Sequence, residues 1–501
     1  MNSSIMSKLT YRGYVIQKSS LSSDQLAALK YDLAIAPKEN HVVKMAKKSN
    51  NDNLIIVYRE NEQKIYIPRF YGVRHFGEPG LSELSPGLDI DVSFTQTLRD
   101  YQEKIINVYM SHIRLPGSDS GGGGGGGILE VPCGAGKTIM ALNICSRLKK
   151  KTLILVHKEF LMNQWIDRIR DFLPSARVGK IQGKTFDIEN KDIVIGMIQT
   201  MYDRPYPPNT FASFGLTISD EVHRVGSEEF SKTLLKVVTP YMLGISATVD
   251  RKDGLTELLY MFIGPKIYSE TRKDDDGVQV RAIQFDDSDE EYREEQRDGR
   301  GNIKYSTMIN QISDFRPRRL FLMRVLQDLI LENSEKQIMV LSHKRDLLDY
   351  LETEITTTFG GFATVGQYVG GMKPAALQES EGKQIVLATY AMAAEALDIK
   401  SLNTLVMVSP KTDIIQSVGR ILRTRCDGKI IVDIVDSHEV FQNQWKKRRA
   451  FYKKSIYGIK MIKSKDYVDM MMVNSDAWTT VYDRNKHVVG EEPKSTCQLD
   501  F

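Results

Sequence analysis

The heptapeptide PCGAGKT, at residues 132–138, is the feature that most restricts what this chain can fold into. It separates a short apolar run, ILEV, from a helical stretch, TIMALNICSRLKK. Glycines at such a strand-to-helix junction allow backbone N–H groups to close around phosphate oxygens at the helix N-terminus. The general pattern G-x-x-x-x-G-K-[ST] begins with a glycine where this chain has Val131, but the ending G-x-G-K-T is intact. The residues predicted to hold the phosphates are Pro132, Cys133, Gly134, Ala135, Gly136, Lys137 and Thr138.

An acidic pair follows a later apolar run, LTIS, and opens the tetrapeptide DEVH. In the phosphate site, Lys137 is predicted to reach the β and γ oxygens and Thr138 to ligate Mg²⁺. Asp220 can hold the same Mg²⁺ through water, and Glu221 can polarise the attacking water as a general base. The two motifs together predict hydrolysis of ATP with Mg²⁺.

Short β-branched runs alternate with amphipathic stretches over residues 95–268 and again over residues 316–460. This alternation is typical of βαβ units around a parallel sheet, so an α/β fold with two tandem domains is predicted. Residues 1–94 are predicted to form a small α+β accessory domain, because NLIIVY and KIYIPRFYG flank the polar RENEQ as in a hairpin. The charged residues 269–315 are interpreted as a solvated connection, and residues 461–501 as a C-terminal tail.

A run of seven glycines, at residues 121–127, precedes the first predicted strand. Glycine loses more conformational entropy on ordering than any other residue, so the run is predicted to be a mobile loop.

Composition narrows the class of protein without giving its function. The net charge is only +4, so a uniformly basic surface is not expected. The four cysteines lack C-x-x-C spacing, and neither a long apolar run nor a signal peptide is present. A soluble, intracellular protein without a membrane span is therefore predicted.

Taken together, the motifs resemble those of superfamily 2 helicases over roughly residues 95–455. The resemblance implies two RecA-like domains, ATP and Mg²⁺ as ligands, and nucleic acid as partner, with DNA favoured and RNA possible. It leaves the oligomeric state open. The segment LRDYQ, at residues 98–102, is similar to the adenine-recognising segment of the family, which assigns Arg99 and Gln102 to the nucleotide.

Further segments of the first domain resemble family motifs for strand binding and coupling. VHK at residues 156–158, with the later QW at 164–165, is similar to a motif that grips the bound strand, and MIQT at 197–200 to a second. SAT at 246–248 matches the motif that couples hydrolysis to domain movement. The implied strand contacts are His157, Lys158, Gln199 and Thr200, and the implied coupling residues are His223, Ser246 and Thr248.

Three segments of the second domain complete the resemblance. LSH, ending at His343, and AT, ending at Thr389, resemble strand-contacting motifs. AEALDI resembles the G-x-D-I motif and assigns Asp398 to the nucleotide, although Ala396 replaces the usual glycine. QSVGRILR matches the pattern Q-x-x-G-R-x-x-R. Transfer of the γ-phosphoryl group needs cations on its equatorial oxygens, so the candidates are Arg420 and Arg423 as arginine fingers, with Gln416 in coupling.

Within the superfamily, His223 and the compact second domain look closest to the XPB-like branch and to small helicases of large DNA viruses and phages. That placement implies the host cytoplasm, a viral factory or the virion. Two alternatives stay open: an ATP-gated clamp or remodelling factor that does not unwind strands, and a P-loop ATPase unrelated to nucleic acid. The second-domain motifs argue against the latter.

Two basic segments have a structural interpretation beside a functional one. WKKRRAFYKK, at residues 445–454, holds cations that can neutralise phosphates and aromatics that can either stack a base or dock on the second domain. The three lysines at 149–151 are interpreted as capping a helix C-terminus, where cations oppose the helix dipole.

Overall fold

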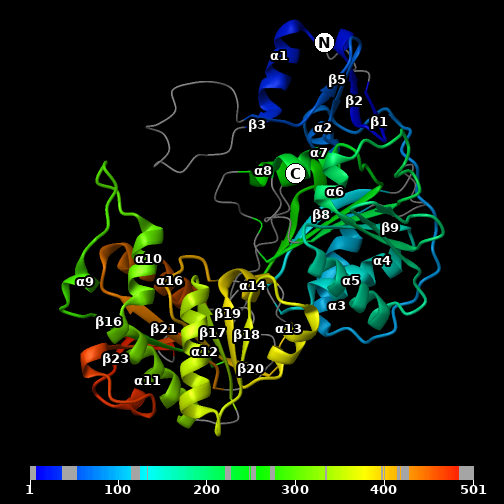
Figure 1. The fold of residues 1–501 in the computed structure, drawn as a ribbon. Helices are drawn as coiled ribbons and strands as arrows, with labels where there is room; N and C mark the ends of the chain where they lie inside the picture. Colours follow the sequence, from blue (N-terminus) through cyan, green and yellow to red (C-terminus); the bar gives the residue numbers. More distant parts are fainter. Residues whose placement is uncertain are drawn as a thin grey trace. The chain divides into compact units, whose positions relative to one another are not determined.

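The computed structural model divides the chain into two compact units, residues 1–271 and 272–501 (Figure 1). Among the described residues, no helix combines the length and the apolar character needed to cross a membrane. The structure describes residues 7–35, 54–113, 124–132, 134–220, 227–247, 249, 255–270, 277–332, 336–395, 399, 401–414, 418 and 428–484.

The N-terminal part of the first unit is a small five-stranded sheet with two helices (Figure 1). Its strand order is β5-β6-β2-β1-β7, and only the β1–β7 edge is parallel. This arrangement agrees with the predicted α+β fold. The elements are β1 (Ser7–Thr10), β2 (Gly13–Gln17), α1 (Ser23–Asp32), β3 (Ala34–Ile35), β4 (Ile55–Ile56), β5 (Arg59–Glu60), β6 (Lys64–Ile67), α2 (Arg69–Phe76) and β7 (Leu81–Ser82).

A hairpin forms near the predicted place, but its first strand is not the apolar run NLIIVY. The polar residues of β5 pair with β6, while β4, from the middle of that run, pairs with β3. Ile55 and Val57 are buried. The apolar run is therefore used for packing, and the short polar strand forms the hairpin.

The first α/β sheet follows in the order β11-β10-β12-β9-β13-β14-β8-β15. All neighbouring strands are parallel except β10 and β11. The elements are α3 (Asp100–His112), β8 (Gly125–Glu130), α4 (Lys137–Leu148), β9 (Thr152–Val156), α5 (Glu159–Phe172), β10 (Val178–Gln182), β11 (Thr185–Phe186), β12 (Ile193–Met197), α6 (Ile198–Asp203), β13 (Leu216–Asp220), α7 (Ser227–Leu234), β14 (Tyr241–Ser246), α8 (Thr256–Ile263) and β15 (Lys266–Ser269).

Alternate residues of the central strands enter two different cores. In β9, Leu153 and Leu155 belong to one buried cluster, and Ile154 and Val156 to the other. This follows from the two-residue repeat of a strand, which points successive side chains to opposite faces. Both faces of the sheet are thus covered, as in doubly wound α/β proteins.

The N-terminal sheet shares one of these cores. Tyr14 and Ile16 of β2 lie in the same buried cluster as residues of β9 and α8. Arg69 of α2 donates hydrogen bonds from Nη1 to the carbonyl oxygens of Thr239, at 3.0 Å, and Pro240, at 2.6 Å. The N-terminal part is therefore packed into the first unit.

The predicted glycine loop is wrong for its last three residues, because residues 125–127 begin strand β8. A Cβ on Gly126 would lie 2.2 Å from the backbone oxygen of Ile263 and 2.5 Å from the ring of Phe70. A Cβ on Gly127 would lie 2.7 Å from the side chain of Ile267. Only glycine fits so close to neighbouring chain. The contacts and strand pairing offset the entropic cost on which the prediction relied.

The second unit holds a sheet in the order β18-β19-β17-β20-β21-β16-β22-β23, parallel except for the edge strand β23 (Figure 1). The two α/β sheets confirm the predicted fold class. The elements are β16 (Gln279–Phe285), α9 (Glu290–Arg293), α10 (Tyr305–Asp314), α11 (Arg316–Glu332), β17 (Gln337–Ser342), α12 (Arg345–Phe359), β18 (Val365–Tyr368), α13 (Pro374–Glu381), β19 (Ile385–Thr389), α14 (Tyr390–Glu395), β20 (Leu402–Met407), β21 (Ile430–Asp436), α16 (Glu439–Lys454), β22 (Gly458–Lys463) and β23 (Thr479–Tyr482).

The boundaries expected for the second domain differ from the structure at both ends. Strand β16, inside the predicted solvated connection, lies between β21 and β22 and is mostly buried. Its charge at Arg281 is buried and paired with Glu332, with 2.6 Å between Nη1 and Oε2. At the other end, β23 and the buried Trp478 belong to the same unit, so the predicted tail is wrong up to β23. The charged residues of this segment led to the prediction of a solvated connection. Strand β16 is nevertheless part of the core, because the charge of Arg281 is neutralised inside the fold.

Candidate nucleotide site and nucleic-acid contacts

The phosphate loop joins the end of β8 to the start of α4, as the sequence predicts. Gly134 and Gly136 have φ of 83° and 85°, in the left-handed region that favours glycine. Lys137 is the first residue of α4, so Lys137 and Thr138 lie at the positive end of the helix dipole. Of the loop residues, Cys133 lies outside the described part of the chain.

Gln102 and Tyr101 of α3 hold the phosphate loop through one carbonyl group. Gln102 Nε2 donates to the oxygen of Ala135 at 3.1 Å, and Tyr101 Oη donates to it at 2.9 Å. Gln102 Oε1 accepts from the backbone N–H of Arg99 at 3.0 Å. A Cβ on Gly136 would lie 2.4 Å from Gln102 Nε2, and the left-handed φ of 85° favours glycine at this position. Gln102 thus contacts the loop itself, and its contact with adenine stays a prediction, as does that of Arg99.

Asp220 ends strand β13 as a buried carboxylate. Its Oδ2 accepts a hydrogen bond from Trp165 Nε1 at 3.0 Å. Trp165 lies on α5 and is itself buried, and its part in a strand-gripping motif stays a prediction. It positions the acidic residue. Glu221 and His223 lie outside the described residues.

The strand register aligns the candidate residues along one edge of the sheet. Asp220 is opposite Ile245, and the next residue of β14, Ser246, is opposite Glu130 of β8. Neighbouring strands lie about 4.8 Å apart, so β13 and β8 are separated by roughly 10 Å. Val131 N also donates to the oxygen of Ser246 at 2.9 Å. Asp220, at the end of β13, and the start of the phosphate loop, after β8, therefore lie at the same edge of the sheet.

Glu130 was not identified from the sequence, although it is central to this edge. Its Oε1 accepts from the N–H of Val249 at 2.7 Å, and its Oε2 accepts from Ser269 Oγ at 2.6 Å and Lys266 Nζ at 3.2 Å. Burial by itself raises the pKa of Glu130, but these donors outweigh it and the pKa lies below the usual value. Glu130 thus ties the loop strand to the chain after the SAT motif and to the last strand of the sheet. The signal in the sequence that could have identified Glu130 was its charge within the apolar run ILEV.

The predicted strand contacts of the first unit lie at the same edge. His157 and Lys158 follow β9, and Gln199 and Thr200 begin α6 after the adjacent strand β12. Gln199 Nε2 donates to the backbone oxygen of His157 at 3.0 Å. Thr200 Oγ1 accepts from the N–H of Gly183 at 3.0 Å. The structure brings these residues together, and their contact with a strand stays a prediction.

His343 and Thr389 also lie at adjacent strand ends, in the second unit. His343 follows Ser342, which pairs with Thr389. The His343 Nε2 atom is 2.9 Å from the oxygen of Pro410. Burial lowers the pKa of His343, which favours the neutral ring, and contact of His343 with a strand stays a prediction. The remaining predicted residues, Thr248, Asp398, Gln416, Arg420 and Arg423, lie outside the described residues.

Helix α16 separates its aromatic and basic residues. Trp445 and Tyr452 are buried, as the docking interpretation requires. Arg448 is buried too, with its Nε 2.8 Å from Asp433 Oδ2. The four lysines of the segment, including Lys446 and Lys453, are exposed, and Arg449 is half-buried. The lysine run at 149–151 divides similarly, because only Lys149 caps helix α4, whereas Lys150 and Lys151 are buried.

Comparison with known proteins assigns the chain to a family. Residues 95–251 match the family described as "Type III restriction enzyme, res subunit". A protein of Acanthamoeba polyphaga mimivirus, L396, named as an ATP-dependent RNA helicase, is 34% identical over 478 residues, covering 92% of this chain and 87% of that protein. The chain belongs to the superfamily 2 helicases.

A further relative and a solved structure are similar to this chain. The "DNA 3'-5' translocase XPB2" of Sulfurisphaera tokodaii is 35% identical over 173 residues, covering 34% of this helicase and 35% of XPB2. The solved structure of S. cerevisiae Dbp5 has a TM-score of 0.50 and 12% identity, and covers 74% of this helicase and 91% of that chain. The likeness to Dbp5 shows the fold alone. The helicase is thus an ATP-dependent enzyme acting on nucleic acid, similar to helicases of large DNA viruses.

Proposed function

We propose that this helicase hydrolyses ATP at the phosphate loop and uses the energy to move along nucleic acid. One observation carries the proposal. Along a single edge of the first sheet, in the order β12-β9-β13-β14-β8, stand Gln199, His157, Asp220, Ser246 and the loop that begins after Glu130. A change at the phosphate end of this edge can reach the strand-contacting end through paired neighbouring strands.

The chemistry proposed for the site follows from its donors. Thr138 and Asp220 offer the hard oxygen ligands that Mg²⁺ prefers, and Mg²⁺ would neutralise charge on the β and γ phosphates. Lys137 adds a cation at the helix N-terminus. Trp165 keeps Asp220 in one orientation through its hydrogen bond. Glu221, next in the chain, is proposed as the base that orients the attacking water.

Arg420 and Arg423 are proposed to complete the reaction from the second unit. Arginine fingers stabilise the charge that develops on the transferred phosphoryl group and accelerate turnover by roughly 10³-fold or more. Asp398 is proposed to contact the nucleotide, and Thr248 and Gln416 to couple hydrolysis to movement. These assignments rest on the family motifs.

DNA is proposed as the preferred nucleic-acid substrate, with RNA or a DNA–RNA hybrid as the alternative. The name of XPB2 gives a DNA translocase, whereas that of L396 gives an RNA helicase. The naming of XPB2 as a translocase also favours movement without strand separation as the second candidate function. ATPase rates with single-stranded, duplex, forked and hybrid substrates test the proposal. Turnover that ignored every nucleic acid would contradict it.

Strand displacement and triplex displacement separate the two candidate activities. A helicase that unwinds releases a labelled strand from a fork, whereas a translocase displaces a third strand from an intact duplex without separating the duplex. Activity in the triplex assay alone would assign translocation. Activity on the fork would assign unwinding.

A further inference from the structure

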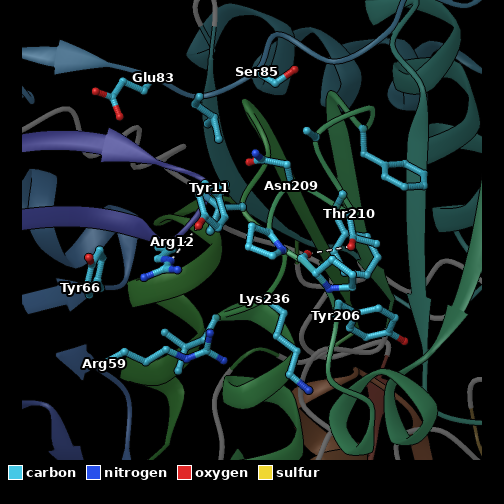
Figure 2. A pocket seen from close by; sticks show the side chains of 18 of the residues that line it. Tyr11, Arg12, Arg59, Tyr66, Glu83, Ser85, Tyr206, Asn209, Thr210 and Lys236 are labelled. Atoms are coloured by element: carbon cyan, nitrogen blue, oxygen red, sulfur yellow. Dashed lines mark hydrogen bonds between the residues drawn. The ribbon is translucent and has the colours of Figure 1, made fainter. Parts of the chain in front are cut away.

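A cavity of about 590 Å³ lies in the first unit, between the N-terminal sheet and the first α/β sheet. Tyr11 and Arg12, from the turn between β1 and β2, and Arg59 of β5 line one side. The segment 206–214, which leads into β13, lines the other side, with Lys236 below it. Figure 2 shows these side chains converging on one hollow. Its volume falls within the range of small-ligand sites.

The cavity is separate from the ATP site. Segment 206–214 precedes the first residue of β13, and Lys236 precedes β14. The phosphate loop follows the last residue of β8, and these three strands run parallel. The cavity therefore opens at the edge of the sheet opposite the phosphate loop. None of the residues that line the cavity belongs to the ATP motifs or the strand-contact motifs.

The charge lining the cavity is positive. Its two carboxylates are already neutralised: Glu60 pairs with Lys18 and Lys30, and Glu83 with Lys8. Among the described residues, no carboxylate forms an ion pair with either of the two lining arginines. Surface cations usually lie close to acidic groups, so an uncompensated pair at a cavity wall favours an anionic ligand.

The cations of the cavity also influence one another. Burial and then the charge of Arg12 lower the pKa of Arg59. Burial and then the charge of Arg59 lower the pKa of Lys236. The Lys236 ammonium donates to the carbonyl oxygens of Met201, Tyr202 and Arg204, at 2.6 to 2.9 Å, so it contributes charge while its protons hold the loop. A bound anion would relieve this mutual repulsion.

Aromatic and apolar groups stand beside the cations. The Arg12 guanidinium carbon lies 5.3 Å from the ring centres of both Tyr11 and Tyr66. Its Nε donates to Tyr11 Oη at 2.9 Å. Pro207 and Pro208 supply apolar surface on the opposite wall. Cations next to aromatic rings are the combination that binds a phosphate together with a stacked base.

We infer that this cavity binds a nucleotide, with the phosphate at Arg12 and Arg59 and the base against the tyrosines. The nucleotide can come from an unpaired segment of a nucleic-acid strand or from a free mononucleotide. The inference rests on the proposed action on nucleic acid and adds a second contact to it, on the N-terminal part of the chain and away from the motor edge.

The test compares the Arg12→Ala/Arg59→Ala variant of the full chain with the wild type. Binding of a labelled oligothymidylate, and of an RNA oligonucleotide of equal length, is measured without ATP over a series of salt concentrations. Loss of one neutralised single-strand phosphate lowers the magnitude of the slope of log K against log salt by about 0.7, and a fall of this size is expected. Affinity should drop about tenfold, while basal ATPase activity should stay unchanged. The single variant Arg59→Gln should give half the change in slope.

A matched control is the Arg168→Ala/Arg170→Ala variant, which removes two cations from the surface of α5. It should keep the wild-type slope. Competition by AMP at millimolar concentration would assign the site to free nucleotides, and resistance to AMP would assign it to a strand. An unchanged slope in the Arg12/Arg59 variant, or equal competition by polyglutamate, would overturn the inference. Failure of the proposed function is distinguishable, because the wild type itself would then show neither binding nor stimulated turnover.

Discussion

The two α/β sheets have a similar arrangement of parallel strands, but the acidic residues that end β21 and β13 have different neighbours. In the second unit, Arg318 binds Asp436 through two hydrogen bonds, at 2.6 and 2.9 Å, and both side chains are fully buried. In the first unit, Asp220 accepts a hydrogen bond from the indole of Trp165. The arginine of the second unit serves stability, whereas the indole of the first orients a carboxylate that is proposed to hold Mg²⁺ beside the phosphate loop.

The largest expected effect distinguishes the chemical roles within the first sheet. Lys137→Ala and Glu221→Gln should each lower ATP turnover by about 10³-fold or more, because one removes phosphate charge and the other the base. Only Lys137→Ala should also lose nucleotide affinity. Steady-state ATPase assays and binding of a fluorescent ATP analogue measure the two effects. Equal loss of affinity in both variants would contradict the assigned roles.

The next effect tests the structural role of charge in the second sheet. Arg318→Ala should destabilise the protein by about 3–5 kcal/mol, because it leaves Asp436 buried without its cation. The double variant Arg318→Met/Asp436→Leu should recover most of this loss, since it removes both charges. Urea unfolding followed by circular dichroism measures both. A double variant as unstable as Arg318→Ala would show that the pair itself, and not an isolated charge, decides stability.

A smaller effect tests the glycines that begin strand β8 in the first unit. Gly126→Ala should cost about 1–3 kcal/mol, because its Cβ has no room beside the backbone of Ile263. Gly458→Ala is the matched control, since it also lies in a strand and its Cβ would meet nothing within 4 Å. Thermal unfolding of the two variants gives the comparison. Equal Tm values would mean that the strand has room for side chains.

The smallest effect has a defined pH dependence. Glu130→Gln should cost about 1 kcal/mol at pH 7, because it removes a charged acceptor from Ser269 and Lys266. The pKa of Glu130 is lowered by folding, so its stabilisation is complete above the unfolded value near 4.3 and is lost as pH falls through the folded value. Unfolding midpoints between pH 3 and pH 8 should show the gap closing at the acid end. Glu103→Gln, which loses only a surface ion pair with Arg147, should show almost no gap.

The sequence predicted the parts of this fold that depend on local pattern. The α/β rhythm and the phosphate loop were recognisable because glycines, Lys137 and apolar runs stand at fixed short spacings. Strand β16 was missed because its buried Arg281 is neutralised by Glu332, a partner that only the folded chain brings near. The hydrogen bond from Trp165 to Asp220 was not predicted for the same reason, since it joins residues far apart in sequence.

The glycines that begin β8 also have a consequence for a change in the length of the chain. A shift of one residue within a strand moves every following side chain to the opposite face of the sheet. Here a gained or lost glycine is replaced in the strand by another glycine, so residues 125–127 of β8 keep their identity and Ile128 keeps its register with Gly244. The repeat therefore isolates the catalytic loop from length variation upstream of it.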